Sequence, residues 1–262
     1  MGTILELQGV SMSFGGLKAV DSLTFDVGEN EIVSIIGPNG SGKTTTFNVI
    51  SGLYEPDSGD ILLKGESVAG LRPDQVHDKG ISRTFQSLRL FSNMSVLDNV
   101  LVGMHSVTDA GLIASMLRLP KVRREEAAMR VKAQAILEMF PGRFSGPRQQ
   151  QPAFSLSYAN RRRLEIARAL ASEPALLLLD EPVAGMNPME SREVMEQIKV
   201  LRDKGYTILM IEHDMHVVEG VSDRVIAMDH GVKIAEGTYT EVANDPQVVE
   251  AYLGKRAAEA TA

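Results

Sequence analysis

Apolar and polar residues alternate along the first part of the chain, as they do in half-buried strands. Residues 4–8 and 23–27 follow this pattern, and a glycine pair at 15–16 supplies a turn between them. Residues 31–36 form a mostly β-branched run, which predicts a short buried strand, and 61–63 predicts one more. The pattern therefore indicates antiparallel strands that lead into the first strand of a core.

The spacing of apolar residues becomes helical beyond residue 95. Apolar side chains recur at helical intervals across 96–104, and Ser95 with Asp98 resembles the start of a capped helix. Residues 125–140 form a second helical run. We therefore expect residues 95–171 to be a mainly helical subdomain inserted into an α/β core.

The core pattern returns after the helical subdomain. Residues 175–180 and 207–211 are apolar runs of strand length, and Asn187, Pro188 and Glu190 mark the start of a helix between them. The core is therefore expected to comprise 1–94 and 172–254. Two further predictions are a hairpin formed by 224–228 and 232–235, and a flexible tail over 255–262.

A glycine-rich segment, GPNGSGKTT, follows the strand predicted at 31–36 and precedes a helix. Loops of this kind turn their backbone N–H groups toward phosphates, and the start of the following helix adds positive potential. Lys43 is expected to reach the β- and γ-phosphates, and the Thr44 hydroxyl is expected to bind Mg²⁺. The predicted phosphate-binding residues are Gly37, Pro38, Asn39, Gly40, Ser41, Gly42, Lys43, Thr44 and Thr45.

Two acidic residues end the apolar strand in LLLLDEP. Asp180 is suited to hold the Mg²⁺ shell, and Glu181 is suited to polarise a water that faces the γ-phosphate. Without the glycine-rich segment, the same residues would also fit an ordinary acidic turn. Together the two segments predict a site for ATP and Mg²⁺.

Composition and charge narrow the classes of function. The chain has 262 residues and a net charge of −7, which argues against nucleic acid as the main partner. It has no cysteine, which excludes disulfides and thiol catalysis. No apolar run approaches the roughly 20 residues of a membrane-spanning helix, so any membrane part is expected to come from other chains.

The order of four features identifies a family. GPNGSGKTT, SLSYANRRRLEIARAL, LLLLDEP and a histidine after TILMIE occur in this sequence as they do in the ATP-binding subunits of ABC transporters. The resemblance covers residues 3 to 254. It implies a P-loop ATPase core, with a mixed sheet flanked by helices, an antiparallel β subdomain and the inserted helical subdomain.

The resemblance also implies roles for single residues. Gln86, in RTFQ, matches a glutamine that senses Mg²⁺ and the transport subunit, although an ordinary polar loop residue is an alternative. His213 matches a histidine that would bind the γ-phosphate and hold Glu181, and a purely structural histidine is the alternative. The other four histidines, His77, His105, His216 and His230, are not expected to have this role.

The signature segment departs from the family pattern, which has LSGGQ where this chain has Leu156 to Asn160. In the family this segment contacts ATP bound by a second subunit, and Ser157 keeps the hydroxyl that would do so. Ala159 replaces a glycine, a change that is costly only if its φ angle is positive. The arginines at 161–163 are expected on a solvated or subunit-facing surface.

Phe14 occupies the place of an aromatic residue that stacks on adenine in many members of the family. Packing within the first hairpin is an alternative for this residue.

The segments GGLKAVD, RTFQ with MSVLDNV, LSYANRRRLEIARAL, EPVAGMNP and AEGT with AYLG resemble those of the ATPase subunits of importers for branched-chain amino acids. Urea or amide importers and lipid or polysaccharide exporters are alternatives. The resemblance implies transmembrane permease subunits, a second ATP-binding subunit, favouring a heterodimer, and indirectly a substrate-binding protein. The expected location is the cytoplasmic face of the inner or plasma membrane.

Overall fold

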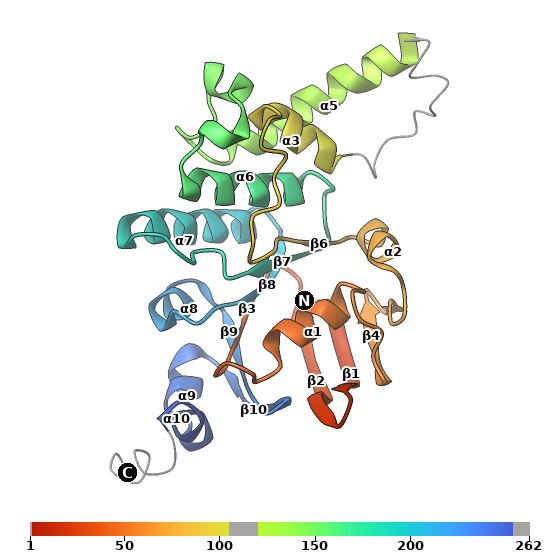
Figure 1. The fold of residues 1–262 in the computed structure, drawn as a ribbon, viewed down its shortest axis with the longest axis vertical. Helices are drawn as coiled ribbons and strands as arrows, with labels where there is room; N and C mark the ends of the chain where they lie inside the picture. The colour runs from red at the N-terminus through yellow and green to blue at the C-terminus, as the bar shows by residue number, and fades with distance from the viewer. Residues whose placement is uncertain (1, 105–119, 254–262) are drawn as a thin grey trace.

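The computed structural model describes residues 2–104 and 120–253, and Figure 1 shows their arrangement. Helices α3, α5 and α6 gather at one end of the molecule, and an antiparallel sheet lies toward the other (Figure 1). His105 and the predicted tail at 255–262 fall outside the described residues. Across the described part of the chain, no helix is long and apolar enough to cross a membrane.

An antiparallel sheet of four strands is built from the first part of the chain, in the order β2-β1-β4-β5. Its strands are β1 (Thr3–Phe14), β2 (Leu17–Gly28), β4 (Ser58–Leu63) and β5 (Glu66–Ser67). β1 and β2 are longer than the alternation at 4–8 and 23–27 predicts, because bulges in their pairing interrupt the strict two-residue period.

A second sheet of six strands forms the centre of the molecule, in the order β10-β9-β3-β8-β7-β6. Its members are β3 (Ile32–Ile36), β6 (Ile81–Arg83), β7 (Leu176–Asp180), β8 (Thr207–Ile211), β9 (Arg224–Asp229) and β10 (Val232–Gly237). All neighbours pair in parallel except β9 and β10, which form the predicted hairpin. Parallel strands in one sheet end at the same edge, so loops from distant parts of the sequence meet there.

Helices cover this central sheet and cap the molecule. Their bounds are α1 (Lys43–Ile50), α2 (Pro73–Asp78), α3 (Val96–Gly103), α5 (Pro120–Glu138), α6 (Tyr158–Leu170), α7 (Pro188–Asp203), α8 (Met215–Val221), α9 (Tyr239–Ala243) and α10 (Pro246–Leu253), with short 3₁₀ turns at Gly146–Gln150 and Ala153–Ser155. The predicted helix start at Asn187 is confirmed, since its side chain accepts hydrogen bonds from the N–H groups of Met189 and Glu190. Ser95 likewise caps α3 by accepting from Asp98 N–H.

Two large apolar clusters cover the two faces of the central sheet. One joins α3, α5, α6 and α7 to one face, through residues such as Leu177 and Met210. The other joins the antiparallel sheet and α1 to the opposite face, through residues such as Leu178 and Ile211. Strands β3, β7 and β8 are buried at every position, which explains why they are apolar without alternation. The predicted α/β fold, with its mixed and antiparallel sheets, is confirmed.

The sequence pattern missed strands β5 and β6 and helices α2, α9 and α10. β6 has three residues, and its pairing with β7, distant in sequence, makes it a strand. A run this short carries no periodic signal of its own.

Candidate functional site

The glycine-rich segment forms a tight loop between the end of β3 and the start of α1. Gly42 has a φ angle of 102°, and a Cβ at this position would lie 2.3 Å from the Ala19 carbonyl oxygen. A Cβ on Gly37 would lie 2.1 Å from the Met228 carbonyl oxygen. Both positions therefore exclude any side chain, and the loop shape depends on them.

Lys43 begins α1, and its side chain lies against the loop that precedes it. The Nζ atom donates to the carbonyl oxygens of Gly37, at 2.7 Å, and Pro38, at 2.9 Å. Burial lowers the pKa of the Lys43 ammonium, and the charge of Glu181 partly opposes that shift. The ammonium group is thus held at the loop that would cradle phosphates.

A cleft of about 660 Å³ opens beside this loop. Its walls come from the antiparallel sheet, the loop, α1 and the ends of the central strands. The predicted residues that line it are Phe14, Asn39, Gly40, Ser41, Gly42, Lys43, Thr44, Thr45 and Glu181. His230 also lines it, which the sequence did not suggest. Phe14 is partly exposed at the cleft and contacts the Tyr54 ring edge-on, with ring centroids 5.2 Å apart. This position allows a base to stack on Phe14, and that role stays a prediction.

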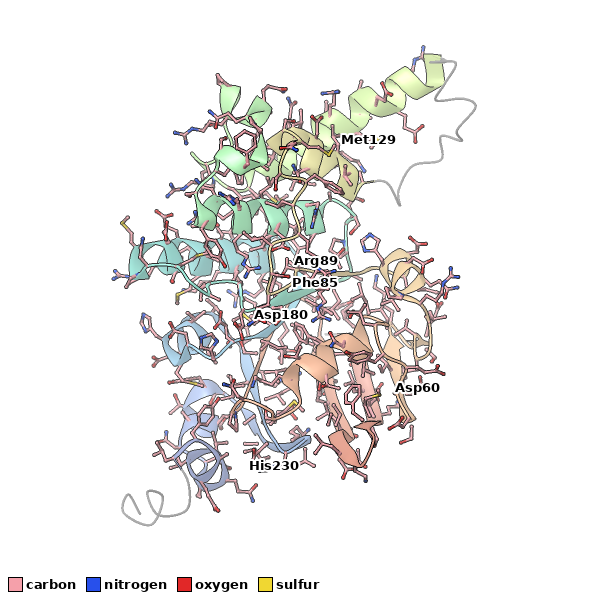
Figure 2. All side chains as sticks on the ribbon, viewed as in Figure 1. Asp60, Phe85, Arg89, Met129, Asp180 and His230 are labelled. Atoms are coloured by element: carbon pink, nitrogen blue, oxygen red, sulfur yellow. The ribbon has the colours of Figure 1, made fainter. Side chains whose placement is uncertain are left out.

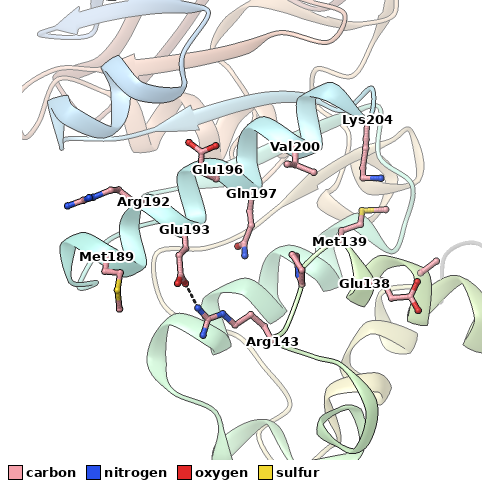
Figure 3. A pocket seen from close by; sticks show the side chains of 12 residues that line it. Glu138, Met139, Arg143, Met189, Arg192, Glu193, Glu196, Gln197, Val200 and Lys204 are labelled. Atoms are coloured by element: carbon pink, nitrogen blue, oxygen red, sulfur yellow. Dashed lines mark hydrogen bonds and ion pairs between the residues drawn. The ribbon is translucent and has the colours of Figure 1, made fainter.

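A larger hollow of about 820 Å³ lies between α5 and α7 and is drawn in Figure 3. An ion pair between Arg143 and Glu193 crosses it, and Met139, Met189 and Val200 contribute apolar surface. Its lining includes no residue that the sequence assigned to the nucleotide, so the smaller cleft is the candidate site.

Glu181 lies directly after β7, with a positive φ angle of 47° that is uncommon for a residue with a side chain. Its backbone N–H donates to the Ile211 carbonyl oxygen at 3.0 Å, which holds the turn against β8. Strained backbone of this kind costs about 1–3 kcal/mol and persists where the surrounding structure enforces it. Here it places the carboxylate in the wall of the cleft.

Gln86, Glu181 and His213 converge although they are far apart in sequence. Gln86 Nε2 donates to Glu181 Oε2 at 3.1 Å. His213 Nδ1 lies 3.6 Å from Glu181 Oε1. The carboxylate therefore has an amide on one side and an imidazole on the other. The edge of the parallel sheet explains the convergence, because Glu181 follows β7, His213 follows β8 and Gln86 follows β6.

Asp180 is buried at the end of β7 and forms an ion pair that the sequence did not predict. Arg83 Nη2 donates to Asp180 Oδ2 at 2.9 Å, with side-chain exposures of 6% and 7%. Arg83 Nη1 also donates to Asn48 Oδ1 at 2.8 Å and to Ser51 Oγ at 2.9 Å. Arg83 thus orients Asp180 and ties it to α1, the helix that carries Lys43 and Thr44.

Glu212 is a second buried carboxylate that the sequence did not single out. Its oxygens accept from the backbone N–H groups of Val183, His213 and Asp214. Burial raises the pKa of Glu212, and these three hydrogen bonds oppose the shift. The carboxylate links the turn after β7 to the turn after β8, and so supports the backbone of both Glu181 and His213.

Ser157 and Ala159 begin α6, away from the cleft that the glycine-rich loop lines. Ser157 is the N-cap residue of α6, and its Oγ accepts from Asn160 N–H at 3.4 Å. Ala159 lies in the first turn of the helix and is 1% exposed. It is absent from the residues with positive φ, so its Cβ is not strained. The signature is therefore a helix start, to which alanine is well suited.

The expectation that residues 161–163 form a solvated or subunit-facing surface is wrong for two of the three. Arg162 and Arg163 are 0% and 1% exposed. Arg162 pairs with Glu165, and Arg163 pairs with Glu193 of α7. The run of three basic residues suggested solvent, but acceptors of α6 itself and of elements distant in sequence surround these two guanidinium groups.

Comparison with known proteins agrees with this geometry. Residues 20–184 match the ABC transporter family. The chain belongs to that family. The family resemblance expected from the sequence is thereby confirmed, and this ABC cassette is an ATPase of the kind that drives transport. Residues 232–258 also match a family described as the branched-chain amino acid ATP-binding cassette transporter.

Relatives are similar in sequence to this cassette over nearly its whole length. It is 44% identical over 253 residues to the high-affinity branched-chain amino acid transport ATP-binding protein LivG of Salmonella typhimurium, covering 96% of this chain and 98% of that protein. It is 41% identical over 254 residues to the corresponding protein BraF of Pseudomonas aeruginosa, with the same coverage of 96% and 98%. A solved ABC transporter cassette in its ADP conformation is 33% identical, with a TM-score of 0.84, covering 97% of this chain and 100% of that one.

Proposed function

We propose that this cassette hydrolyses ATP with Mg²⁺ to drive the import of branched-chain amino acids. The observation that carries the proposal is the convergence of Gln86 and His213 on Glu181, in the wall of the cleft that the glycine-rich loop lines. An acyl- or sugar-transfer site would not need a phosphate loop beside a carboxylate of this kind. The loop, by contrast, supplies backbone donors and an ammonium group for a triphosphate.

Thr44 and Asp180 fit Mg²⁺ by the chemistry of their oxygen atoms. Mg²⁺ prefers hard oxygen ligands and takes one or two from the protein, with phosphates and water completing its shell. Thr44 presents a hydroxyl in the first turn of α1, and Arg83 binds Oδ2 of Asp180, leaving Oδ1 for this use. A bound Mg²⁺ would neutralise charge that develops on the phosphate oxygens.

Glu181 is the residue that we assign to the attacking water. Its carboxylate would accept the proton or hydrogen bond of a water aligned with the γ-phosphate. Gln86 donates a hydrogen bond to one carboxylate oxygen, and His213 lies near the other, so both flank the group that would meet the water. Lys43 would stabilise the negative charge of the transferred group.

We propose that a second ATP-binding subunit completes the site. Ser157 and Ala159 do not line the cleft, and we propose that the start of α6, where Ser157 is exposed, contacts a nucleotide held by another cassette. The start of a helix favours an anion by about 0.3–2 kcal/mol. We propose that a related subunit fills this place in the cell.

The transported substrate follows from the relatives rather than from the cleft, since the amino acid would not touch the cassette. The LivG and BraF proteins named above, and the family matched by residues 232–258, all carry branched-chain amino acid transport in their descriptions. We propose that permease subunits anchor the cassette at the cytoplasmic face of the membrane, and that a substrate-binding protein delivers leucine, isoleucine or valine to them.

Transport in reconstituted vesicles tests this proposal. The cassette is assembled with the permease and second ATP-binding subunits of a branched-chain amino acid importer, and radiolabelled leucine or urea is offered with the binding protein. ATP-dependent movement of leucine toward the side that carries the cassette is expected, with no movement when ADP replaces ATP. Movement of urea alone, or export of either solute, would refute the proposed substrate or direction.

A further inference from the structure

One face of the signature helix carries three charged side chains at three-residue intervals. Arg162, Glu165 and Arg168 lie on this face of α6, and all three point toward the segment that contains Gln86. Figure 2 labels Phe85 and Arg89 of that segment, which lie between α6 and the strand end at Asp180. We call the three side chains the α6 stripe.

The α6 stripe binds the backbone of the Gln86 segment rather than its side chains. Arg162 donates to the carbonyl oxygen of Phe85 and, at 2.8 Å, to that of Gln86. Glu165 Oε1 accepts from Arg89 N–H at 3.3 Å, and Arg168 donates to the Arg89 carbonyl oxygen. Four backbone groups within five residues are therefore held by one helix.

The stripe includes an ion pair that is costly to bury. Arg162 and Glu165 are 0% and 1% exposed, and they contact each other at 3.0 Å. Arg162 Nε has no hydrogen-bond partner, which adds to the cost. Apolar residues of similar size often stabilise a core as well as, or better than, such a pair. Stability alone therefore does not account for these residues, whereas the need to bind four loop groups does.

The residues on either side of the Gln86 segment show where the backbone leaves the central sheet and joins the helices. Before it, Thr84 N–H donates to the Leu178 carbonyl oxygen at 2.9 Å, so residue 84 still belongs to the central sheet. After it, the buried Asn99 of α3 accepts from Phe91 N–H at 3.0 Å and donates to the Phe91 carbonyl oxygen at 3.1 Å. The backbone changes its attachment from the sheet to the helices between residues 84 and 85.

We propose that the α6 stripe is a positioning device that makes the Gln86 segment part of the same rigid body as the signature helix. The stripe sets where the Gln86 amide meets Glu181, and any displacement of α6 carries that amide with it. The start of α6, which faces the neighbouring nucleotide, and the amide beside this subunit's own Glu181 are then one mechanical unit. The catalytic meaning of this unit depends on the ATPase function proposed above.

A distance measurement tests directly whether the α6 stripe clamps the Gln86 segment; we call this hold of the stripe on the segment the clamp. The chain has no cysteine, so spin labels can be placed at exposed Ser87 and Val131, in the segment and on α5. We expect a single narrow distance distribution in the otherwise native chain. The double variant Arg162→Met with Glu165→Met removes both charges together, which avoids leaving an unpaired buried charge. We expect this variant to lose the narrow distribution.

Arg163→Met is the matched control, because Arg163 is an equally buried arginine of the same helix that binds α7 instead. We expect the control to keep the narrow distribution. A narrow distribution in the double variant, or equal broadening in the control, would overturn the clamp. This readout needs neither nucleotide nor permease, so its failure is separate from failure of the proposed function.

A kinetic measurement tests what the clamp does for the reaction. Arg162→Lys keeps the positive charge beside Glu165 but loses the planar fork that reaches two carbonyl oxygens. In the assembled transporter we expect kcat for ATP to fall roughly 10-fold, as misplacement of a positioned group does, with KM for ATP little changed. An unchanged kcat together with a broadened distance distribution would show that the clamp does not position Gln86 for hydrolysis.

Discussion

The two ends of the cleft are built in different ways. At one end, the glycine-rich loop depends on consecutive residues, whose conformation is fixed by the absence of side chains at Gly37 and Gly42. At the other end, Glu181 depends on Gln86 and His213, which come from separate strands and are brought together by the sheet. The residues of the first end are contiguous in sequence, although the carbonyl oxygens that crowd Gly37 and Gly42 come from the distant Met228 and Ala19. The residues of the second end come together only in the fold.

This difference predicts how each end fails. A change in the loop removes space that no neighbour can restore, so nucleotide binding itself is expected to suffer. A change at the carboxylate end removes a contact between side chains, so the chemical step or the local stability should suffer while the nucleotide still binds. Variants at the two ends can therefore separate binding from hydrolysis.

Gly42→Ala is expected to have the largest effect on nucleotide binding. The added Cβ would meet the Ala19 carbonyl oxygen at 2.3 Å, at a φ angle of 102°. The clash displaces the loop, and we expect ATP affinity to fall by about 100-fold or more, or roughly 2.7 kcal/mol. Titration with a fluorescent ATP analogue measures the loss.

Gly65→Ala is the control, since Gly65 has a similar φ angle of 80° but nothing within 4 Å of the added Cβ. This variant should lose about 1–2 kcal/mol of stability from backbone strain and bind ATP normally. If Gly42→Ala bound ATP as tightly as Gly65→Ala, the loop would not depend on the absence of a side chain.

Arg83→Met is expected to have a large effect on stability rather than on nucleotide binding. It leaves Asp180 buried without its partner, which typically costs about 3–5 kcal/mol. Chemical unfolding of the full chain measures the change, and Arg83→Met combined with Asp180→Asn should recover much of it. Arg72→Met is the control, because the Arg72–Asp74 pair is exposed and its loss should be nearly silent. Equal effects of the two arginine variants would mean that Arg83 does not support Asp180.

Ala159→Gly is expected to have the smallest effect on activity. The family pattern has glycine here, but Ala159 lies within the first turn of α6 and does not need a positive φ angle. Glycine should therefore give little gain in hydrolysis by the assembled transporter, and it should weaken the helix by about 0.5–1 kcal/mol. A severalfold gain in ATP turnover would mean that the native alanine obstructs the composite site.

The sequence predicted the local end of the cleft more fully than the distant end. The loop from Gly37 to Thr45 was readable because its glycines, lysine and helix start are contiguous. Asp180 and Glu181 were readable because they end an apolar strand. The caps at Ser95 and Asn187 were readable for the same reason, since each involves residues at most three positions apart.

Contacts between distant residues explain what the sequence could not predict. Arg83 and Asp180 are 97 positions apart, and the three-residue strand β6 that carries Arg83 has no periodic pattern of its own. Arg162 and Arg163 resemble a solvated basic run, and only the packing of α6 against the Gln86 segment and α7 shows that they are buried. Glu212 next to His213 was overlooked because its partners are backbone N–H groups, which leave no mark in the sequence.

In this account Glu181 activates the attacking water, while the glycine-rich loop binds the nucleotide. The most direct test compares ATP hydrolysis and ATP binding in the Glu181→Gln variant of the assembled transporter, with the exposed Glu196→Gln variant as control. Glu181→Gln should lower turnover by about 100-fold or more, the contribution typical of a general base, and leave ATP affinity unchanged. Near-normal hydrolysis in Glu181→Gln would contradict the account.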